Sequence, residues 1–442
     1  MIENISKKVV KFGGSSLSSA KQFKKVSDIV LSDPTRCFVI PSAPGKRDDF
    51  EEKVTDMLIE CHRLASDGRE YLPIFEKIKA RFNEIIRGLE LNITLDNEFS
   101  VIEEWLQKGC TRDYVASRGE YLNGILLSQY IGFTFIDAAE VIMFDKNGIF
   151  DSNKTNIIMS ERLANEKSAV IPGFYGSLPS GEIKTFSRGG SDITGAIVAR
   201  AVLADLYENW TDVSGFLMCD PRIVKDPKAI HTITYRELRE LSYMGATVLH
   251  EDSIFPVKHA GIPINIRNTN RPDDEGTFII PNERNYKDTG IITGIAGKKG
   301  FAVLHIEKDM MNNEIGFGMR VLKVLADMGL SFEHFPSGID TMSLIINGDE
   351  IHGKEKKLLA EISRTVNPDN VSLETGMSLI AIVGRGMINA PGTASRIFSA
   401  IAQAGVNIRM IDQGSSELNI IVGVDELSFG KAIRAIYDEF AE

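Results

Sequence analysis

Cysteine and histidine are scarce in this chain, and neither forms a pattern that would bind a metal. The four cysteines, Cys37, Cys61, Cys110 and Cys219, are widely separated and contain no C-x-x-C pair. The seven histidines show no ligand spacing. The simplest interpretation is a cytosolic protein with reduced, buried thiols and no metal site built from side chains alone.

Positive charge and long apolar runs are also in short supply. Lysine and arginine number 50 against 61 acidic residues, which gives a net charge of -11. This balance argues against nucleic acid and anionic membranes as partners, so any phosphate site must be local. No stretch approaches the length of a membrane span, and the first residues do not lead from a basic segment into an apolar run. We therefore expect a soluble, cytoplasmic protein.

The chain is long enough for two or three domains, with 442 residues of which 43% are hydrophobic. Over residues 1–285, short β-branched runs alternate with helical patterns, which predicts an α/β fold with a largely parallel sheet between helices. A polar, helix-rich stretch at 48–111 is interpreted as an excursion over the active site. The polar segment 268–286 predicts the domain boundary. The expected strands are 9–12, 37–40, 134–137, 169–172, 204–210 and 262–267.

A strand, a glycine turn and a helix start follow one another at Lys11-Phe-Gly13-Gly14-Ser15. Such an element can cradle phosphate, because unpaired backbone N–H groups point to one spot beside a lysine charge. The lysine precedes the glycines, so this is not a P-loop. An edge lysine followed by an ordinary turn is the alternative.

A second glycine cluster strengthens the phosphate interpretation. Arg188, Gly189, Gly190, Ser191 and Asp192 open another predicted helix, so an anion could be held from two sides. The alternative is a helix capped by Ser191 or Asp192, although capping alone does not require the arginine and two glycines. A third motif follows the strand 204–210 and contains Thr211, Asp212, Phe216, Leu217 and, in a D-P-R sequence, Arg222.

Together with Ser117-Arg-Gly-Glu120, these motifs resemble the aspartate kinases of the amino acid kinase family. That family carries K-F-G-G-[ST]-S, S-x-G-E, R-G-G-S-D and T-D-V-x-G-[IF]-x-x-x-D-P-R in the same order. The likeness covers nearly the whole chain. It implies transfer of the ATP γ-phosphoryl group to the β-carboxylate of L-aspartate, giving 4-phospho-aspartate. This reaction is the first step of lysine, threonine and methionine biosynthesis.

The resemblance assigns roles to particular residues. A carboxylate is already ionised at neutral pH and needs no general base, so the enzyme must overcome charge repulsion. Lys11 would supply the cation and Asp192 would orient it. Arg188 would fork onto the substrate α-carboxylate. Glu120 would take the α-ammonium, although it could also be the N3 residue of a capping box with Ser117.

The remaining expected contacts fall into two groups. The substrate group is Ser42, Glu120, Arg188, Gly189, Gly190 and Ser191. The nucleotide group is Lys11, Gly13, Gly14, Ser15, Thr211, Asp212, Phe216, Leu217 and Arg222. Mg²⁺ would be held mainly by ATP phosphate oxygens, because no cluster of acids has ligand spacing.

Two segments depart from the family pattern. In one, Thr247 stands where lysine is usual and Glu251 where proline is usual; in the other, Arg47 stands where threonine is common. A cation near the nucleotide is therefore missing, and Lys46, Arg47 or Lys258 could replace it. These departures keep open a catalytically weak amino-acid sensor, against which intact Lys11, Arg188 and Asp192 weigh. A kinase for another amino acid or for a nucleotide is the other alternative.

The C-terminal part contains an internal repeat at an offset of 76 residues, which superimposes 321–332 on 397–408 and Gly329 on Gly405. Each unit resembles an ACT domain, a small ferredoxin-like module that binds amino acids where two modules meet. The predicted modules are 301–375 and 376–442. The second repeat ends before its last strand, so we expect a strand from 291–297 to complete it.

The ACT resemblance implies feedback regulation by an amino acid, most simply lysine, with threonine as the alternative. The expected effector residues are Glu314, Gly316, Phe317, Gly318, Ser331, Phe332, Glu333 and Ser337. Glu333 is a candidate partner for a cationic ligand or, equally, a solvated acid on a strand. Pairing of ACT modules from two chains predicts a homodimer or a dimer of dimers.

Overall fold

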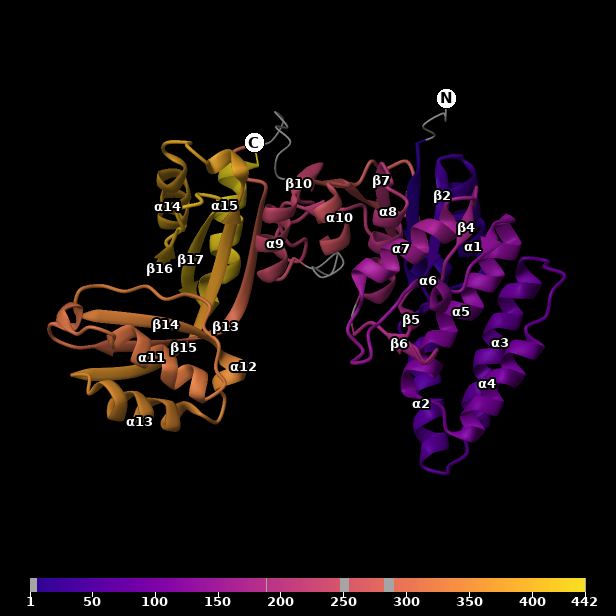
Figure 1. The fold of residues 1–442 in the computed structure, drawn as a ribbon. Coiled ribbons are helices and arrows are strands. Elements are labelled where there is room, and N and C mark those ends of the chain that lie inside the picture. The colour runs from indigo at the N-terminus through magenta and orange to yellow at the C-terminus, as the bar shows by residue number, and fades with distance from the viewer. Residues whose placement is uncertain (1–5, 188, 247–253, 282–289, 442) are drawn as a thin grey trace. The chain divides into compact units, whose positions relative to one another are not determined.

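The computed structural model describes residues 6–187, 189–246, 254–281 and 290–441. The chain divides into two compact units (Figure 1). The first unit includes residues 6–216, 229–236 and 254–281, and the second includes 217–228, 237–246 and 290–441, within these described parts. The predicted domain 1–285 therefore does not coincide with the first unit, because two of its segments belong to the second.

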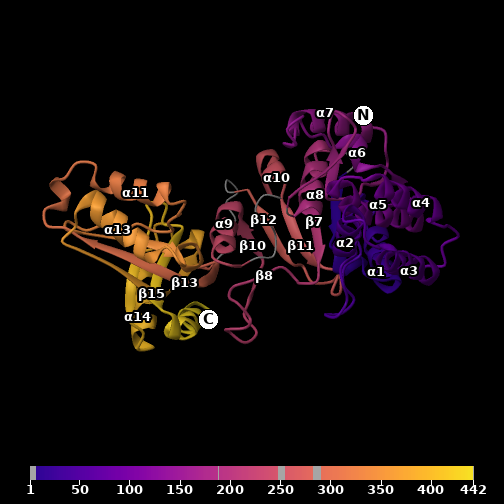
Figure 2. The ribbon, with the colours of Figure 1, turned by 90° about the horizontal axis from the view of Figure 1, so that it is seen from below.

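An eight-stranded sheet forms the centre of the first unit, in the order β10-β12-β11-β7-β1-β2-β4-β3. All neighbouring strands are parallel except β11 and β12, so the expected largely parallel sheet is confirmed. Figure 2 shows β12, β11 and β7 side by side. The strands are β1 Lys8–Phe12, β2 Arg36–Pro41, β3 Thr134–Phe135, β4 Ala169–Val170, β7 Leu206–Thr211, β10 Thr232–Thr234, β11 Ile264–Asn268 and β12 Thr277–Ile280.

Helices cover both faces of this sheet. Successive side chains of a strand point to opposite faces, so Val10 and Phe12 of β1 face one layer and Lys11 faces the other. Helix α8 packs against β1, β2 and β7. The helical elements of this unit are η1 Gly14–Leu17, α1 Ala20–Leu31, α2 Val54–Ser66, α3 Leu72–Gly88, α4 Asp96–Lys108, α5 Arg112–Ile131, α6 Ala138–Val141, α7 Ser152–Leu163, α8 Gly190–Ala201 and α10 Phe255–Ala260.

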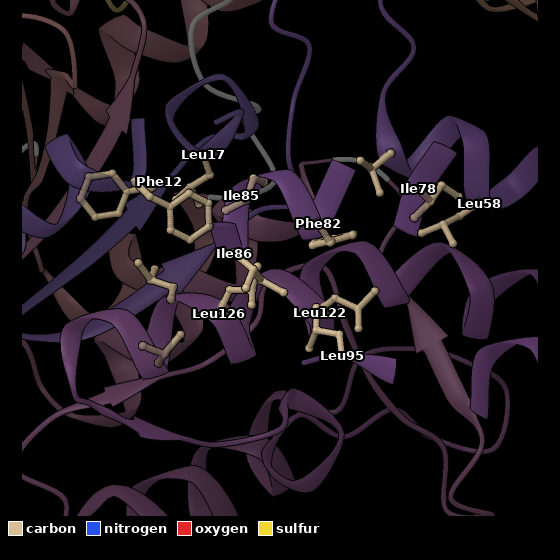
Figure 3. Close-up of a cluster of buried hydrophobic side chains, with 14 of the residues drawn as sticks. Phe12, Leu17, Leu58, Ile78, Phe82, Ile85, Ile86, Leu95, Leu122 and Leu126 are labelled. Carbon is tan, nitrogen blue, oxygen red and sulfur yellow. The ribbon is translucent and has the colours of Figure 1, made fainter. Parts of the chain in front are cut away.

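A large hydrophobic cluster joins the other sheet face to helices α1–α5. Figure 3 shows Phe12 and Leu17 beside Ile85 and Ile86 of α3. The predicted excursion 48–111 is thus a set of three helices, α2, α3 and α4, whose apolar faces are buried in the same core as β1. Burial of each large apolar side chain contributes about 1.5–3 kcal/mol, so α3 is firmly attached to the sheet.

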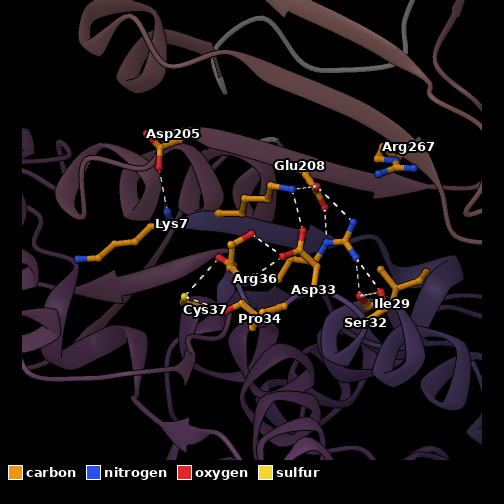
Figure 4. A network of polar contacts seen from close by, with 12 residues as sticks. Lys7, Ile29, Ser32, Asp33, Pro34, Arg36, Cys37, Asp205, Glu208 and Arg267 are labelled. Atoms are coloured by element: carbon orange, nitrogen blue, oxygen red, sulfur yellow. Dashed lines mark hydrogen bonds and ion pairs between the residues drawn. The ribbon is translucent and has the colours of Figure 1, made fainter. Parts of the chain in front are cut away.

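A buried ionic network stabilises the amino-terminal half of the central strands (Figure 4). Glu208 of β7 is fully buried and accepts hydrogen bonds from Nε of Arg36 at 2.8 Å and from Nε1 of Trp210 at 2.9 Å. Lys8 lies 2.8 Å from Asp33 and 3.7 Å from Glu208. Because buried charges require partners, this network ties β1, β2 and β7 together at the end opposite to the predicted site.

The second unit contains a five-stranded antiparallel sheet in the order β14-β13-β15-β17-β16. The long strands β13 and β15 pair twice, Gly294–Lys298 with Leu379–Val383 and Val303–Glu307 with Asn370–Glu374. The segment before the first repeat, which was expected to complete the second repeat, contributes a strand that begins at Gly294 rather than at residue 291. The strands are β13 Gly294–Glu307, β14 Thr341–Asn347, β15 Asn370–Val383, β16 Ile408–Asp412 and β17 Asn419–Asp425.

Two hydrophobic clusters cover the two halves of this sheet. The cluster around the second half also contains Cys219 and Val224 from the segment 217–228. The carbonyl of Met218 accepts a hydrogen bond from the N–H of Ile295 at 2.7 Å and so joins this segment to β13. The helices are η3 Met311–Asn313, α11 Phe317–Asp327, α12 Gly348–Ile351, α13 Glu355–Val366, η4 Arg385–Met387, α14 Thr393–Gln403, η5 Glu426–Ser428 and α15 Phe429–Phe440.

The other short elements are β5 Tyr175–Ser177 and β6 Ile183–Thr185, which form an antiparallel hairpin, then β8 Phe216–Leu217, β9 Ala229–Ile230 and α9 Tyr235–Tyr243. Among the residues that the structure describes, none of the helices is both long and apolar enough to cross a membrane.

Candidate active site

Lys11 and Asp192 meet at the carboxyl end of the central strands. Nζ of Lys11 lies 2.7 Å from Oδ1 of Asp192, and the lysine is 8% exposed. Asn209, which lies opposite Lys11 in the β1–β7 register, donates from Nδ2 to the same Oδ1 at 2.8 Å. The hydroxyl of Tyr207 donates to the backbone carbonyl of Asp192 at 3.1 Å. The carboxylate and the ammonium are therefore held by β1, β7 and α8 together.

The glycine turn after β1 is fixed by close backbone contacts. The N–H of Gly13 donates to the carbonyl of Trp210 at 3.0 Å, and the N–H of Gly45 donates to the carbonyl of Gly14 at 2.8 Å. A Cβ atom on Gly14 would lie 2.9 Å from the carbonyl oxygen of Ala43. The turn therefore requires glycine for space. The first residues of η1, Gly14 and Ser15, have N–H groups without an intrahelical acceptor. A Cβ atom on the preceding Gly13 would lie 3.6 Å from Nζ of Lys11.

Glu120 presents a buried carboxylate that is only half satisfied. It lies on α5, is 6% exposed and accepts a hydrogen bond from the backbone of Ala43. Its Oε2 atom has no hydrogen-bond partner within the described part of the chain. Burial raises the pKa of Glu120 to about 8. Because an orphaned buried oxygen is costly, this carboxylate is suited to a ligand that brings a hydrogen-bond donor.

The capping-box alternative for Glu120 is wrong. Helix α5 begins at Arg112 with Thr111 as its N-cap, whose side chain accepts from the N–H of Tyr114. Ser117 therefore lies inside the helix, where its hydroxyl donates to the carbonyl of Tyr114 at 2.7 Å. One turn further along, Asn123 donates from Nδ2 to the carbonyl of Ser42 at 2.7 Å. The helix thus holds the loop that carries Ser42 and Ala43.

The second glycine cluster forms the amino terminus of α8. Arg188 lies outside the described residues. Gly189 is the N-cap in a left-handed conformation with φ 58°, and no side chain caps the helix, so capping by Ser191 or Asp192 is wrong. A Cβ atom on Gly190 would lie 2.4 Å from the ring of Phe174. Ser191 is 8% exposed and packs closely on Gly173.

Sequence reasoning missed Phe174, which adopts an unusual backbone conformation beside this helix. Its φ is +82°, a value that costs a residue other than glycine about 1–3 kcal/mol. Its N–H donates to Oγ1 of Thr194 at 3.1 Å, and its carbonyl accepts from the N–H of Phe186 at 2.9 Å. Asn209, Asn123 and Tyr207 were missed as well, because each acts through a contact that only the sheet order creates.

The predicted nucleotide residues are divided between the two units. Thr211 ends β7, with Asp212 beside it, and the carbonyl of Thr211 accepts from the N–H of Thr269 at 2.9 Å. Phe216 also belongs to the first unit, but it is 2% exposed, so its side chain does not line an open slot.

Leu217 and Arg222 belong to the second unit. There they line a surface depression of about 530 Å³ together with Ile223 and Lys225. The side chain of Arg222 is 87% exposed and pairs with Asp220 at 2.6 Å.

The departures from the family pattern are only partly visible. Thr247 and Glu251 lie outside the described residues. Arg47 forms ion pairs with Glu51 and, at 2.8 Å, with Glu84 of α3. Its charge is thus neutralised locally, so Arg47 does not supply the missing cation here. Lys46 and Lys258 are exposed. Over the described ranges, no three histidine, cysteine or acidic residues are grouped so that they could hold a metal ion.

The expected effector residues lie in the first half of the antiparallel sheet. Glu314 pairs with Lys308 at 2.6 Å and with Arg320. Gly316 is the N-cap of α11, with φ 79°, and Phe317 is buried. Gly318 faces the ring of Phe335.

The other effector residues follow α11. Glu333 accepts a hydrogen bond from the hydroxyl of Tyr243, so it is not simply a solvated acid. Ser337 forms an isolated bridge with Met342 of β14. Ser331 follows the carboxyl end of α11, whereas Gly316 caps its amino end. The hydroxyl of Ser331 donates a hydrogen bond to Glu350 of α12. Phe332 is 44% exposed and packs on Phe335.

Comparison with known families gives two matches. The model of the Amino acid kinase family matches residues 6–268, and that of the ACT domain matches residues 380–440. Aspartokinase 3 of Bacillus subtilis is 40% identical over 451 aligned positions, which cover 98% of this chain and 98% of that protein.

Solved structures agree with this result. The aspartate kinase of Clostridium acetobutylicum, described as an allosteric enzyme, has a TM-score of 0.92 and 50% identity, covering 98% of this chain and 100% of that one. Aspartokinase III of E. coli, in complex with aspartate and ADP, has a TM-score of 0.74 at 24% identity, covering 99% of this chain and 100% of that one. At this lower identity the likeness shows the fold alone.

Proposed function

The chain belongs to the amino acid kinase family, and on this premise we propose that it is an aspartate kinase. It transfers the γ-phosphoryl group of ATP to the β-carboxylate of L-aspartate and releases 4-phospho-aspartate and ADP. The observation that carries the proposal is the pair of Lys11 and Asp192, 2.7 Å apart beside the glycine turn. The relative from Clostridium, at 50% identity over nearly the whole chain, supports the choice of aspartate.

The chemistry follows from charge. The attacking β-carboxylate is ionised at neutral pH and the γ-phosphoryl group is anionic, so positioning and nearby cations supply most of the catalysis. Lys11 places its ammonium next to the transferred group, and Asp192 with Asn209 fixes its direction. Gly14 and Ser15 offer backbone N–H groups to the phosphates, and Gly13, whose N–H is bonded to the carbonyl of Trp210, shapes the turn. The γ-phosphorus–oxygen bond to ADP breaks as the bond to the carboxylate oxygen forms.

Mg²⁺ is the expected cofactor. We expect it to be held mainly by the phosphate oxygens of ATP. When bound, Mg²⁺ would neutralise part of the negative charge on the β- and γ-phosphates of ATP. Thr211, Asp212, Phe216, Leu217 and Arg222 remain the proposed nucleotide residues.

Aspartate is recognised through its two α-substituents. Glu120 accepts the α-ammonium with the oxygen that now lacks a partner, and Arg188 takes the α-carboxylate in a bidentate pair. Ser42, Gly189, Gly190 and Ser191 complete the pocket. An amino acid with a longer side chain would displace its terminal carboxylate from Lys11, which disfavours glutamate.

Regulation belongs to the ACT modules. We propose that lysine, or threonine as the alternative, binds where first modules of two chains meet, near Glu314, Phe317 and Glu333, in a cytoplasmic homodimer or dimer of dimers. The pathway is lysine, threonine and methionine biosynthesis. Either amino acid at millimolar concentration should lower activity or shift the melting temperature. No change in either quantity with both amino acids would reject this regulatory assignment.

One assay tests the proposed reaction. The protein is incubated with ATP, Mg²⁺ and a panel of amino acids, and acyl phosphate is trapped with hydroxylamine. Aspartate alone should give hydroxamate at a substantial rate. Product with glutamate instead would indicate another amino acid kinase, and no product with any amino acid would favour a weak sensor.

A further inference from the structure

Arg81 is a buried arginine of α3 to which the sequence motifs assign no role. It is 6% exposed, and one of its terminal nitrogens, Nη2, donates both to the carbonyl of Ser18 at 2.8 Å and to the carbonyl of Gly45 at 2.9 Å. Its Nη1 atom pairs with Glu51. Ser18 follows η1 directly and Gly45 belongs to the loop after β2. One guanidinium therefore joins the two segments that follow β1 and β2.

These two segments also touch each other, backbone against backbone. The N–H of Gly45 donates to the carbonyl of Gly14, and a Cβ atom on Gly45 would lie 2.5 Å from the carbonyl carbon of Gly14. The position of the glycine turn thus depends on where Gly45 lies. Arg81 is the side chain that holds Gly45 against the turn from the helical side.

We propose that Arg81 is a positioning residue for nucleotide phosphate. It fixes the loop at Gly45 against the turn at Gly14, and so sets the direction of the Gly14 and Ser15 N–H groups beside Lys11. The inference rests on the proposed kinase function and deepens it, because it names a residue remote in sequence that determines nucleotide affinity.

Arginine is required because the contacts diverge. Two carbonyl oxygens and a carboxylate lie around one planar fork, which a lysine ammonium cannot reproduce in the same geometry. Glu51 completes the arrangement on the outer side. Burial opposes its ionisation, but Arg47 and Arg81 outweigh that effect and lower the pKa of Glu51 to about 2. Arg47 then connects the loop to Glu84, one turn along α3 from Arg81.

The arrangement separates the nucleotide end of the loop from the substrate end. Ser42 is held by Asn123, and Ala43 is held by Glu120. Both anchors come from α5 and do not involve Arg81. Loss of Arg81 should therefore disturb phosphate binding far more than aspartate binding.

The experiment compares Arg81→Met with Arg63→Met in the full-length protein. Arg63 is a matched control on α2, because it also forms ion pairs, with Glu60 and Asp67, but its side chain is 51% exposed. Arg81→Met should raise the KM for MgATP and the Kd for ADP by about tenfold or more, while the KM for aspartate changes less than about threefold. The KM for MgATP and the Kd for ADP of Arg81→Lys should lie between those of Arg81→Met and those of wild type. Arg63→Met should leave all three constants unchanged.

A purely structural role would lower the melting temperature of Arg81→Met and leave the ADP Kd and both KM values as in wild type, and that result would overturn the proposal. If Arg81→Met does not fold, Gly45→Ala decides, because it breaks the same contact from the loop side. Gly45→Ala should raise the Kd for ADP by a similar factor. In a folded double variant the two effects should be less than additive, and full additivity would contradict action through Gly45.

The Kd for ADP also separates this inference from the proposed reaction. A wild-type protein that binds ADP but phosphorylates no amino acid would reject the kinase function and still allow the Arg81 comparison. An active wild-type enzyme whose ADP affinity is unaffected by Arg81→Met would reject only the positioning role.

Discussion

Nδ2 of Asn209 lies 2.8 Å from Oδ1 of Asp192, the same oxygen that lies 2.7 Å from Nζ of Lys11. Asn209 is buried and faces Lys11 across the β1–β7 register. The amide therefore fixes the carboxylate that in turn orients the ammonium. This relationship makes Asn209 a positioning residue that no motif identifies.

Asn209→Ala should lower kcat by about tenfold, because Asp192 loses one of its two partners but keeps its charge. Asp192→Ala should reduce kcat further, since the lysine then lacks its carboxylate. Steady-state kinetics with saturating MgATP and aspartate measures both effects. Equal kcat values for wild type and Asn209→Ala would show that the amide does not position the pair.

Glu120 should make stability depend on pH. Burial raises its pKa to about 8 from an ordinary value near 4.5, so the folded protein retains a proton that the unfolded chain releases. This contribution to stability is fully present below about pH 4.5 and is lost as pH rises to about 8. Glu120→Gln removes the dependence. The free energy of unfolding of wild type minus that of the variant should therefore decrease between these pH values, and a difference that is independent of pH would contradict the raised pKa.

Aspartate binding should release a proton from the same residue at pH 7. Glu120 must ionise to accept the α-ammonium, because its protonated form dominates in the free protein at this pH. Calorimetry in buffers with different ionisation enthalpies measures the number of protons released. Glu120→Gln should abolish the proton release and lower the affinity for aspartate. Buffer-independent binding enthalpies in the wild type would place the ammonium elsewhere.

Glu237 should be essential for the stability of the second unit. It is fully buried and accepts hydrogen bonds from Oγ1 of Thr293 at 2.6 Å and from the backbone N–H of Arg385 at 2.8 Å. Glu237→Ala leaves the partly buried Arg385 guanidinium with fewer partners and should cost about 3–5 kcal/mol in denaturant unfolding. Glu361→Ala, which removes an exposed pair with Arg364, should cost less than about 1 kcal/mol. Similar losses in the free energy of unfolding for the two variants would show that Glu237 is not essential for the stability of the second unit.

The shared strands predict how the regulatory part can be divided. Leu379–Val383 pair with Gly294–Lys298, which a fragment of residues 376–442 lacks. This fragment should be unfolded by circular dichroism, whereas a fragment of residues 288–442 should unfold cooperatively. The longer fragment should still be less stable than the same region in the full chain, because Cys219 and Val224 are missing from its core. A cooperative transition in the short fragment alone would refute the split arrangement.

Local signals explain what the sequence could predict. The Lys11 turn and the Asp192 helix start are contiguous motifs, and parallel strands bring such motifs to one edge. The repeat offset led to the prediction that a strand from 291–297 completes the second repeat, and residues Gly294–Lys298 pair with Leu379–Val383. The offset came from the spacing of the repeat, whereas the roles of Lys11 and Asp192 came from the family resemblance.

Contacts between residues that are distant in the sequence could not be predicted, because they depend on the order of the strands and on helix packing. Asn209 matters only because β7 lies next to β1, and Arg81 only because α3 reaches the loop after β2. The positive φ of Phe174 could not be predicted, because phenylalanine does not favour this backbone conformation. The capping box at Ser117 failed because α5 begins earlier, at Arg112. Leu217 and Arg222 carry a family motif, yet packing against the antiparallel sheet assigns their segment to the second unit.

The most direct test of the account is the rate of aspartyl hydroxamate formation by wild type and by Lys11→Ala under identical conditions. Both proteins receive ATP, Mg²⁺, aspartate and hydroxylamine, and matching circular dichroism spectra establish that both are folded. The account predicts steady product from wild type and a rate at least about a hundredfold lower from Lys11→Ala, because the transferred phosphoryl group loses its cation. Equal rates from the two proteins would contradict it.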